Sequence, residues 1–300
     1  MIPRRIATLA LSVALCLCAS SCSVDEEEPQ EHSSSTDLNL KADIDREALT
    51  VTLPASRYIL NNVDRQFLES AQSAAVAKCA REELNIPWVG WSLDHVGGGK
   101  RTVFSEFGPW TKAMAEHNAF GNPDILSAPP TNVSPNHPGI LNGKIPDNQM
   151  DKMVETCHPK PEVSQFDPIK LRPKSPWTVE LTEAGEKLLK DDRAKQVFSE
   201  VASCYESKGM KMNPEAPGYV KGFTSDDRTP QAFAAAIKAA ECQEKLNATP
   251  RLVEIWAELQ APIITKYADE LIAQRQKIDK AVADAKEYIN AHPELFEPPK

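Results

Sequence analysis

The stretch NVDRQFLESAQSAAVAKCAREELNIP, residues 62–87, is the clearest indication of the fold class of this 300-residue chain. Its apolar side chains recur at three- and four-residue steps, the spacing of one helix face. The residues that follow this spacing are Val63, Phe67, Leu68, Ala71, Ala74, Ala75 and Cys79. The spacing predicts a helix over 62–84, which ends shortly before Pro87.

Similar helical patterns dominate the rest of the chain. Further helices are predicted at 109–119, 147–157, 179–190, 193–208, 229–246 and 250–291. The alternating segment ALTVTLP (48–54) predicts a short strand or an extended arm. Proline and asparagine in 120–146 and 158–178 predict long surface loops. We therefore expect a mainly α, disulfide-stapled helical domain with long Pro-rich loops, a long C-terminal helix and one short N-terminal strand.

A short motif occurs twice. VAKC (76–79) and VASC (201–204) each lie late in a predicted amphipathic helix, and a proline follows each within ten residues. The repeated motif indicates either a weak two-fold repeat of the chain, with a boundary near 160–178, or two helices that end in similar turns. We favour the second interpretation.

The predicted C-terminal helix carries the most regular apolar stripe, in which Arg275 occupies one slot where an apolar residue is expected. Pro262 predicts a bend or a restart, because proline removes a backbone donor. We expect the helix to pack along its own domain; the alternative is that its far end projects and binds a partner helix. The stripe consists of Ile264, Tyr267, Leu271, Ile278, Val282, Ala285 and Ile289.

The N-terminus has the pattern of an export signal. Arg4 and Arg5 precede an apolar run of about 14 residues, shorter than the roughly 20 that a spanning helix needs. Ala19-Ser20-Ser21-Cys22 resembles a bacterial lipobox. This pattern predicts a lipoprotein signal peptide at 1–21 and an acylated Cys22, whose diacylglycerol and N-acyl (palmitate-type) chains anchor the protein to the outer face of the cell membrane. The alternative is an ordinary signal peptide cut near Ser21.

The residues after Cys22 are acidic and rich in serine. This composition predicts a disordered tether over 22–48, followed by an extracytoplasmic domain at 49–300. Loss of Arg4 and Arg5 with the leader changes the net charge from −9 to −11. Such a charge argues against a nucleic-acid partner and against electrostatic adsorption to anionic lipid, so membrane association is expected to depend on the acyl chains.

The mature chain keeps four further cysteines, Cys79, Cys157, Cys204 and Cys242. An even number in an exported protein predicts disulfides, and four cysteines allow three connectivities. None of them forms a C-x-x-C motif, so neither a thioredoxin-like site nor a zinc site is indicated. We favour Cys79–Cys157 with Cys204–Cys242, which pairs neighbours in sequence.

No motif in the sequence names a reaction. H-E-x-x-H, G-x-S-x-G, P-loop and G-x-G-x-x-G patterns are absent, and the histidines lack ligand spacing. We therefore assign no catalytic residue, metal or cofactor apart from the lipid on Cys22. Aromatic and titratable residues gather at 88–110. We favour burial of most of the aromatic rings in the core and a structural loop at Asp94-His95; the alternative is a contact with a glycan, peptidoglycan or protein. These residues are Trp88, Trp91, Asp94, His95 and Trp110.

Three segments resemble a group of uncharacterised actinobacterial secreted proteins and lipoproteins. They are LPASRY…ESAQSAAVAKCAREELNIPW (53–88), VASCYESKGM (201–210) and AAIKAAECQEKLNATPRLVEIWAELQAPII (235–264). The chain departs from that group at Cys79-Ala80 and Leu84-Asn85, where the group often has Cys-Met and Gly. The resemblance implies a secreted, helical, disulfide-bonded fold that works near an envelope transporter, and it implies no catalytic residue.

These observations favour a non-catalytic, lipid-anchored extracytoplasmic binding or accessory protein of the bacterial cell envelope. Its expected partners are the membrane, through the lipid anchor, and an envelope protein, such as a transporter, or peptidoglycan. The competing hypothesis is a cell-surface hydrolase with an unrecognised Asp/Glu/His site within 88–158. A solute-binding component of an importer is disfavoured, because the βαβ alternation of two α/β lobes is missing.

Overall fold

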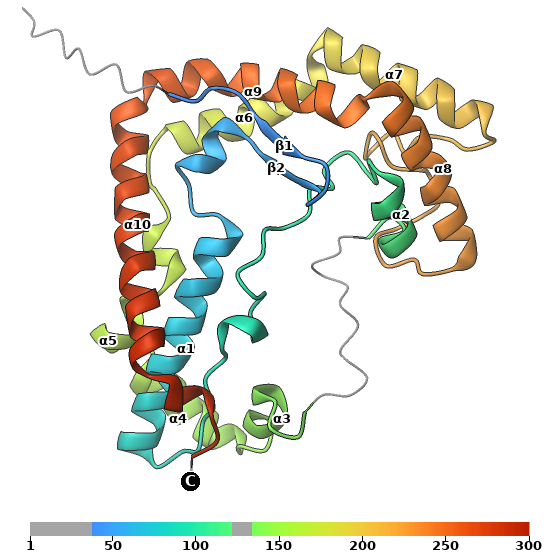
Figure 1. Cartoon of the computed structure of the whole chain (residues 1–300). Helices are drawn as coiled ribbons and strands as arrows, with labels where there is room; N and C mark the ends of the chain where they lie inside the picture. Colours follow the sequence, from blue (N-terminus) through green and yellow to red (C-terminus); the bar gives the residue numbers. More distant parts are fainter. Residues whose placement is uncertain (1–37, 122–133, 300) are drawn as a thin grey trace, which may run out of the picture. The chain divides into compact units, whose positions relative to one another are not determined.

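In the computed structural model, helix α1 (Asn62–Leu84) packs against helices from later parts of the chain, chiefly α10, α4 and α5 (Figure 1). It begins with a capping box, in which Asn61 accepts from the backbone N–H of Asp64 and Asp64 accepts from that of Asn61. It ends at Asn85, whose left-handed backbone lets Ile86 donate to the carbonyl of Ala80 at 2.9 Å. The helix predicted at 62–84 is therefore confirmed.

The structure describes residues 38–121 and 134–299. The longer helices in these ranges are α1, α2 (Lys112–Asn118), α4 (Asp147–Cys157), α6 (Trp177–Lys190), α7 (Asp192–Ser207), α8 (Pro230–Leu246), α9 (Ala248–Lys266) and α10 (Ala268–Ala291). Shorter helical turns are α3 (Pro138–Asn142), α5 (Pro161–Ser164), η1 (Pro54–Arg57), η2 (Leu93–His95), η3 (Pro168–Leu171) and η4 (Pro293–Phe296). The mainly α class is confirmed. Across the described ranges, no helix is both long and apolar enough to cross a membrane.

A two-stranded antiparallel sheet precedes the helices. Strand β1 (Asp43–Asp45) pairs with β2 (Thr50–Thr52), and β2 lies within the predicted strand segment. The compact unit that holds the helices begins at Leu38, so the predicted tether is wrong for 38–48. Leu38, Leu40 and Ile44 pack against the hydrophobic core and order this part. The predicted signal peptide, Cys22 and the rest of the tether lie outside the described residues.

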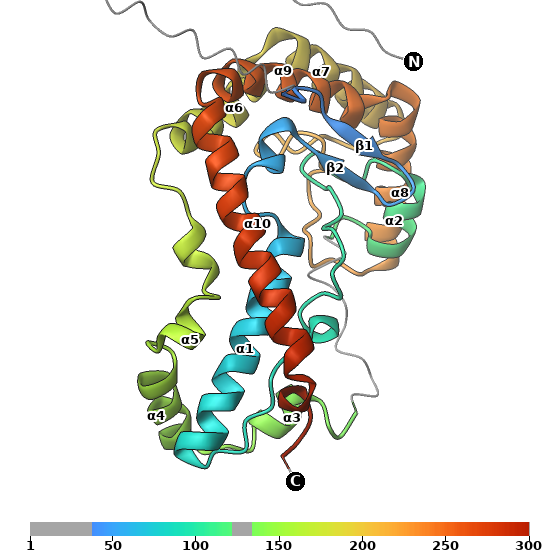
Figure 2. The same ribbon diagram turned by 60° about the vertical axis from the view of Figure 1, so that its left-hand side comes forward.

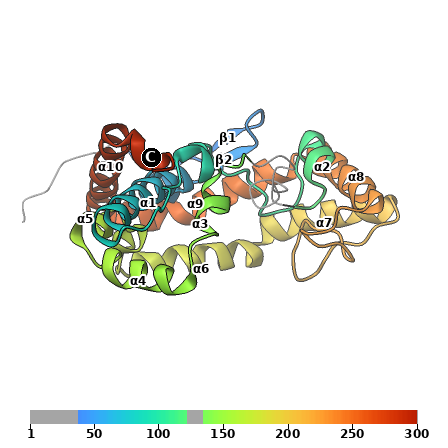
Figure 3. The same cartoon turned by 90° about the horizontal axis from the view of Figure 1, so that it is seen from below.

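Each disulfide belongs to its own hydrophobic cluster. Cys79–Cys157 lies in the cluster of α1, α4 and α10, and Cys204–Cys242 lies in the cluster of α7, α8 and α9. The favoured connectivity is therefore confirmed. Figure 3 shows α2, α7 and α8 grouped apart from α1, α4 and α10. Because disulfides persist in oxidising compartments, the two bridges indicate an extracytoplasmic environment.

The C-terminal helix of the prediction is two helices. Helix α9 runs through Pro262 to Lys266, and the chain bends at Tyr267, so the restart predicted at Pro262 is wrong. The phenol of Tyr267 donates to the Glu180 carboxylate of α6 at 2.6 Å, and this contact holds the bend in place. Helix α10 then packs beside α1, and both run in the same direction (Figure 2). The prediction that this stripe packs along its own domain agrees with buried Leu271, Ile278, Val282 and Ala285.

Candidate functional site

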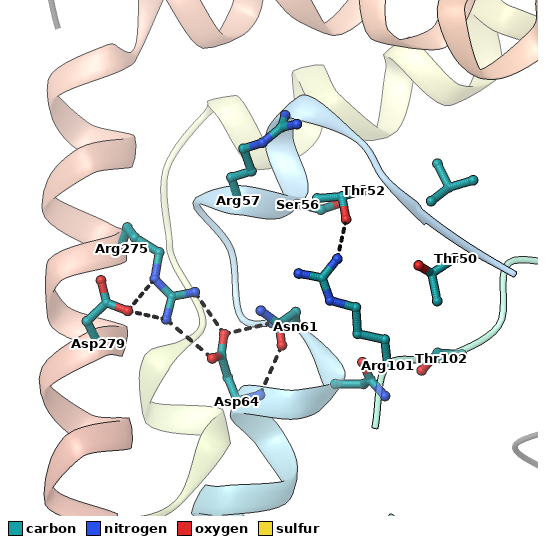
Figure 4. Close-up of a pocket in the computed structure, with 12 residues that line it drawn as sticks. Thr50, Thr52, Ser56, Arg57, Asn61, Asp64, Arg101, Thr102, Arg275 and Asp279 are labelled. Carbon is teal, nitrogen blue, oxygen red and sulfur yellow. Dashed lines mark hydrogen bonds and ion pairs between the residues drawn. The ribbon is translucent and has the colours of Figure 1, made fainter. Parts of the chain in front are cut away.

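A cavity of about 620 Å³ lies where β2, η1, the start of α1 and α10 meet (Figure 4). Three arginines from separate segments line it: Arg57 at the end of η1, Arg101 in the loop before α2, and Arg275 on α10. The other lining residues are Thr50, Val51, Thr52, Ser56, Asn61, Asn62, Asp64, Thr102 and Asp279. This cavity was not predicted from the sequence.

Arg275 is the most constrained of the three arginines. Its guanidinium donates to both carboxylate oxygens of Asp64, at 2.8 and 3.3 Å, and its Nε donates to Asp279 at 2.8 Å. Burial lowers the pKa of Arg275, but the hydrogen bonds to Asp64 and Asp279 outweigh burial and raise it. The arginine in the apolar stripe therefore joins α10 to the capping box of α1 and forms one wall of the cavity.

The other two arginines differ in their partners. Arg57 donates to Asp43 at 2.6 Å and to the carbonyl of Asn39 at 3.2 Å. Arg101 donates to the hydroxyl of Thr52 at 2.9 Å and, among the described residues, forms no ion pair. Figure 4 shows its guanidinium extended towards Thr52. Arg101 is thus the cavity cation whose charge is not already matched by a carboxylate.

The segment that carries Arg101 is fastened to α1. The backbone of Trp91 exchanges hydrogen bonds with Ser70 and Ser73, at 3.0 and 2.9 Å. Further along, Gln66 accepts from the N–H of Gly99 at 2.8 Å and donates to the carbonyl of Lys100 at 3.1 Å. These polar residues of α1 bind the loop backbone as far as Lys100, the residue before Arg101. The backbone position of Arg101 is therefore fixed relative to α1.

The composition of the lining restricts what the cavity can bind. Arg57 is paired with Asp43, and Arg275 with Asp64 and Asp279, so Arg101 is the cation left for a ligand, and one such cation suits a single negative charge better than two. Hydroxyl and amide side chains supply most of the remaining polar groups. None of the described lining residues is aromatic, so the cavity offers no ring for stacking. The arrangement fits a small monoanion that carries hydroxyl groups.

The residues predicted to contact a ligand lie in different places, and two of them meet. Trp91 and His95 approach each other and His137, with ring centroids 6.2 Å (Trp91–His95), 5.5 Å (Trp91–His137) and 4.8 Å (His95–His137) apart. His137 accepts from the backbone N–H of Gly139 at 3.1 Å. No local pattern in the sequence links His137 to His95, because the two residues lie 42 positions apart.

Asp94 does not orient the neighbouring imidazole. The Nδ1 of His95 shares a 2.7 Å hydrogen bond with the hydroxyl of Ser92, while Asp94 is exposed. Partial burial and the nearby His137 lower the pKa of His95, and Asp94 opposes them. The hydrogen bond between Ser92 and His95 is therefore a local contact across η2, and no carboxylate fixes the imidazole.

The two other predicted tryptophans lie apart from this group. Trp110 is 2 % exposed and donates from Nε1 to the carbonyl of Phe104 at 2.8 Å, so it is a core residue and not a surface contact. Trp88 is half-buried and packs between the α1 cluster and the C-terminal Leu295. Core packing, the interpretation favoured for these rings, describes both.

The fold and cavity together define a helical, disulfide-bonded domain with a cationic pocket. Comparisons of the chain with protein families, with characterised proteins and with solved structures found no match. Among the described residues, no group of three or more His, Cys, Asp or Glu side chains is arranged to hold a metal ion.

Proposed function

We propose that the chain is an extracytoplasmic, non-catalytic binding protein of the bacterial cell envelope, and that its cavity takes a small hydroxylated monoanion. The observation that carries the proposal is the Arg101 guanidinium, which has no carboxylate partner among the described residues and lies beside hydroxyls. A ligand carboxylate would accept charge-assisted hydrogen bonds from it. The threonine and asparagine side chains would bind the ligand's hydroxyl groups.

Sugar acids are the first probes, because they combine one carboxylate with several hydroxyl groups. Titration calorimetry with D-glucuronate and D-gluconate should detect binding, and neutral D-glucose should bind more weakly. Arg101→Gln should lower the affinity about tenfold or more, since a hydrogen bond to a charged group is lost. Arg228→Gln is the matched control, because Arg228 is also exposed and, within the described ranges, donates to backbone carbonyls and pairs with no carboxylate.

Two results would reject this assignment. One is the absence of binding by both sugar acids. The other is an equal loss of affinity in Arg101→Gln and Arg228→Gln, which would mean that the anion does not bind in the cavity.

The second part of the proposal is the location. The lipobox-like pattern before Cys22 supports a lipid anchor, and the two disulfides support an oxidising compartment. The resemblance to actinobacterial lipoproteins supports the same location and an association with an envelope transporter. Membrane fractions of intact cells should contain the wild type, and Cys22→Ala should move to the soluble extracytoplasmic fraction. Crosslinking of the wild type in the same cells, followed by pulldown, tests whether a transporter or peptidoglycan is the partner.

A cell-surface hydrolase within 88–158 remains the second candidate. The observation in its favour is the 2.7 Å contact between the Ser92 hydroxyl and His95, which is the distance expected of a nucleophile and its base. The proposal of a binding protein predicts that no ester or glycoside probe is hydrolysed. Hydrolysis that disappears in Ser92→Ala would establish the second candidate instead.

A further inference from the structure

A second pocket, of about 570 Å³, lies on a different face of α10 from the cavity described above. Its α10 residues, Glu270, Ala273, Gln274 and Lys277, follow three- and four-residue steps, and Arg275 is not among them. The opposite wall is the segment between η3 and α6, which runs alongside α10 in Figure 2. The remaining lining residues are Lys170, Arg172, Pro173, Lys174, Ser175 and Trp177.

The charge of this pocket contrasts with that of the whole chain. Four cations, Lys170, Arg172, Lys174 and Lys277, line it together with one carboxylate, Glu270, which leaves a net charge of +3. All four cations are exposed, and within 38–121 and 134–299 none of them forms an ion pair. The net charge of −9 therefore conceals a local positive site.

The walls of the pocket are joined to each other. Gln274 donates to the carbonyl of Leu171 at 2.6 Å, and Lys277 donates to that of Lys170 at 3.4 Å. The hydroxyl of Ser175 donates to the carboxylate of Glu270 at 2.5 Å. The one carboxylate of the pocket is therefore bound by a neutral group and not by one of the four cations. The nearly fully buried Trp177 forms part of the lining. These contacts hold the two walls of the pocket, and with them the backbone positions that carry the four cations, against each other.

We propose that this second pocket binds a phosphate group, carried either by an anionic lipid headgroup or by a soluble phosphate ester. A net charge of +3 attracts a phosphate, which carries up to two negative charges in a monoester and one in a lipid phosphodiester, where neighbouring anionic headgroups supply further charge. Lysine and arginine are the residues that bind phosphate oxygens by charge-assisted hydrogen bonds. Ile169, 64 % exposed and next to Lys170, gives the surface an apolar group that a lipid headgroup region would accept.

The test uses the mature chain, residues 22–300, with Cys22→Ala, so that neither the apolar leader nor an acyl chain contributes to membrane binding. Its binding is measured to vesicles of phosphatidylglycerol and phosphatidylcholine in equal parts, to vesicles of phosphatidylcholine alone, and to soluble sn-glycerol 1-phosphate. The site variant is Lys170→Gln with Arg172→Gln and Lys174→Gln. The control, Lys152→Gln with Lys190→Gln and Lys245→Gln, removes the same charge from exposed lysines elsewhere.

Each lysine or arginine near an anionic surface contributes about a fivefold gain in binding, so the site variant should lose about 100-fold and the control much less. Binding to phosphatidylglycerol vesicles alone would identify a headgroup, and binding to the soluble ester alone would identify a free phosphate ester. Absence of binding to both probes, or an equal loss in the two triple variants, would overturn the proposal. Arg101→Gln should leave this binding unchanged, because Arg101 lines the other cavity.

Discussion

Replacement of Arg275 by methionine tests how far the ion pair to Asp64 stabilises the fold. The Asp64 side chain is 12 % exposed and that of Arg275 is 20 % exposed, so the pair is largely removed from water. Removing one partner of a buried pair costs about 3–5 kcal/mol, because the other charge is left without compensation. Asp64 keeps its hydrogen bond from Asn61 and some solvent contact, and methionine suits the apolar stripe. We therefore expect a loss of about 2–3 kcal/mol, at or just below the lower limit of that range.

Urea unfolding, followed by circular dichroism with both disulfides intact, measures this loss. The double variant Asp64→Asn with Arg275→Met should recover at least half of it, because the buried charge of Asp64 is then removed, while Asp279, which also loses its partner, is 63 % exposed and stays hydrated. Lys280→Met is the control: its side chain is 76 % exposed and pairs with Asp284 one turn on, so its removal should cost less than about 0.5 kcal/mol. An Arg275→Met protein as stable as the wild type would refute this account of the ion pair.

Three further predictions concern the disulfides, one glycine contact and one histidine. Cys204→Ser with Cys242→Ser should lower the free energy of unfolding by about 4 kcal/mol, as expected for a bridge across a sequence separation of 38, and urea unfolding tests this. Gly218→Ala should destabilise the fold much more than Gly209→Ala: both have positive φ, but a Cβ at Gly218 would meet a backbone oxygen at 2.3 Å, whereas none of the described residues comes within 4 Å at Gly209. Equal melting temperatures for these two variants would contradict this packing. Burial and a neighbouring imidazole lower the pKa of His95 in the folded protein. The contribution of His95 to stability is therefore fully present above pH 6.5, its pKa in the unfolded chain, and is lost as the pH falls through the lower pKa of the folded protein. Its NMR titration midpoint should lie below 6.5; a midpoint at or above that value would contradict the prediction.

Local signals explain which helices the sequence predicts well. The bounds predicted for α1 and α4 agree with the structure, because a capping residue or a proline marks each start. The break at Tyr267 depends instead on a contact with Glu180, which is 87 residues away, and no local pattern encodes it. Pro262 was misleading because a long packed helix tolerates the loss of one backbone hydrogen bond.

The cavity was beyond local analysis for the same reason. Its arginines stand at 57, 101 and 275 in the chain and meet only in the folded protein. One sign of it was visible in the sequence: Arg275 interrupts an apolar stripe, and a charge in a core-facing slot requires a partner. The acidic composition of residues 38–48 predicts a tether, although three apolar side chains in this segment pack against the core: Leu38, Leu40 and Ile44.

The most direct test of the central claim is an NMR titration that follows the Nε–Hε signals of the arginine side chains during addition of D-glucuronate. Binding in the cavity predicts a saturable shift of the Arg101 signal, which lines it, and no shift of Arg228, which lies outside it. Shifts of both signals to the same extent, or no shift of Arg101 at saturating ligand, would contradict the assignment of the cavity as the binding site.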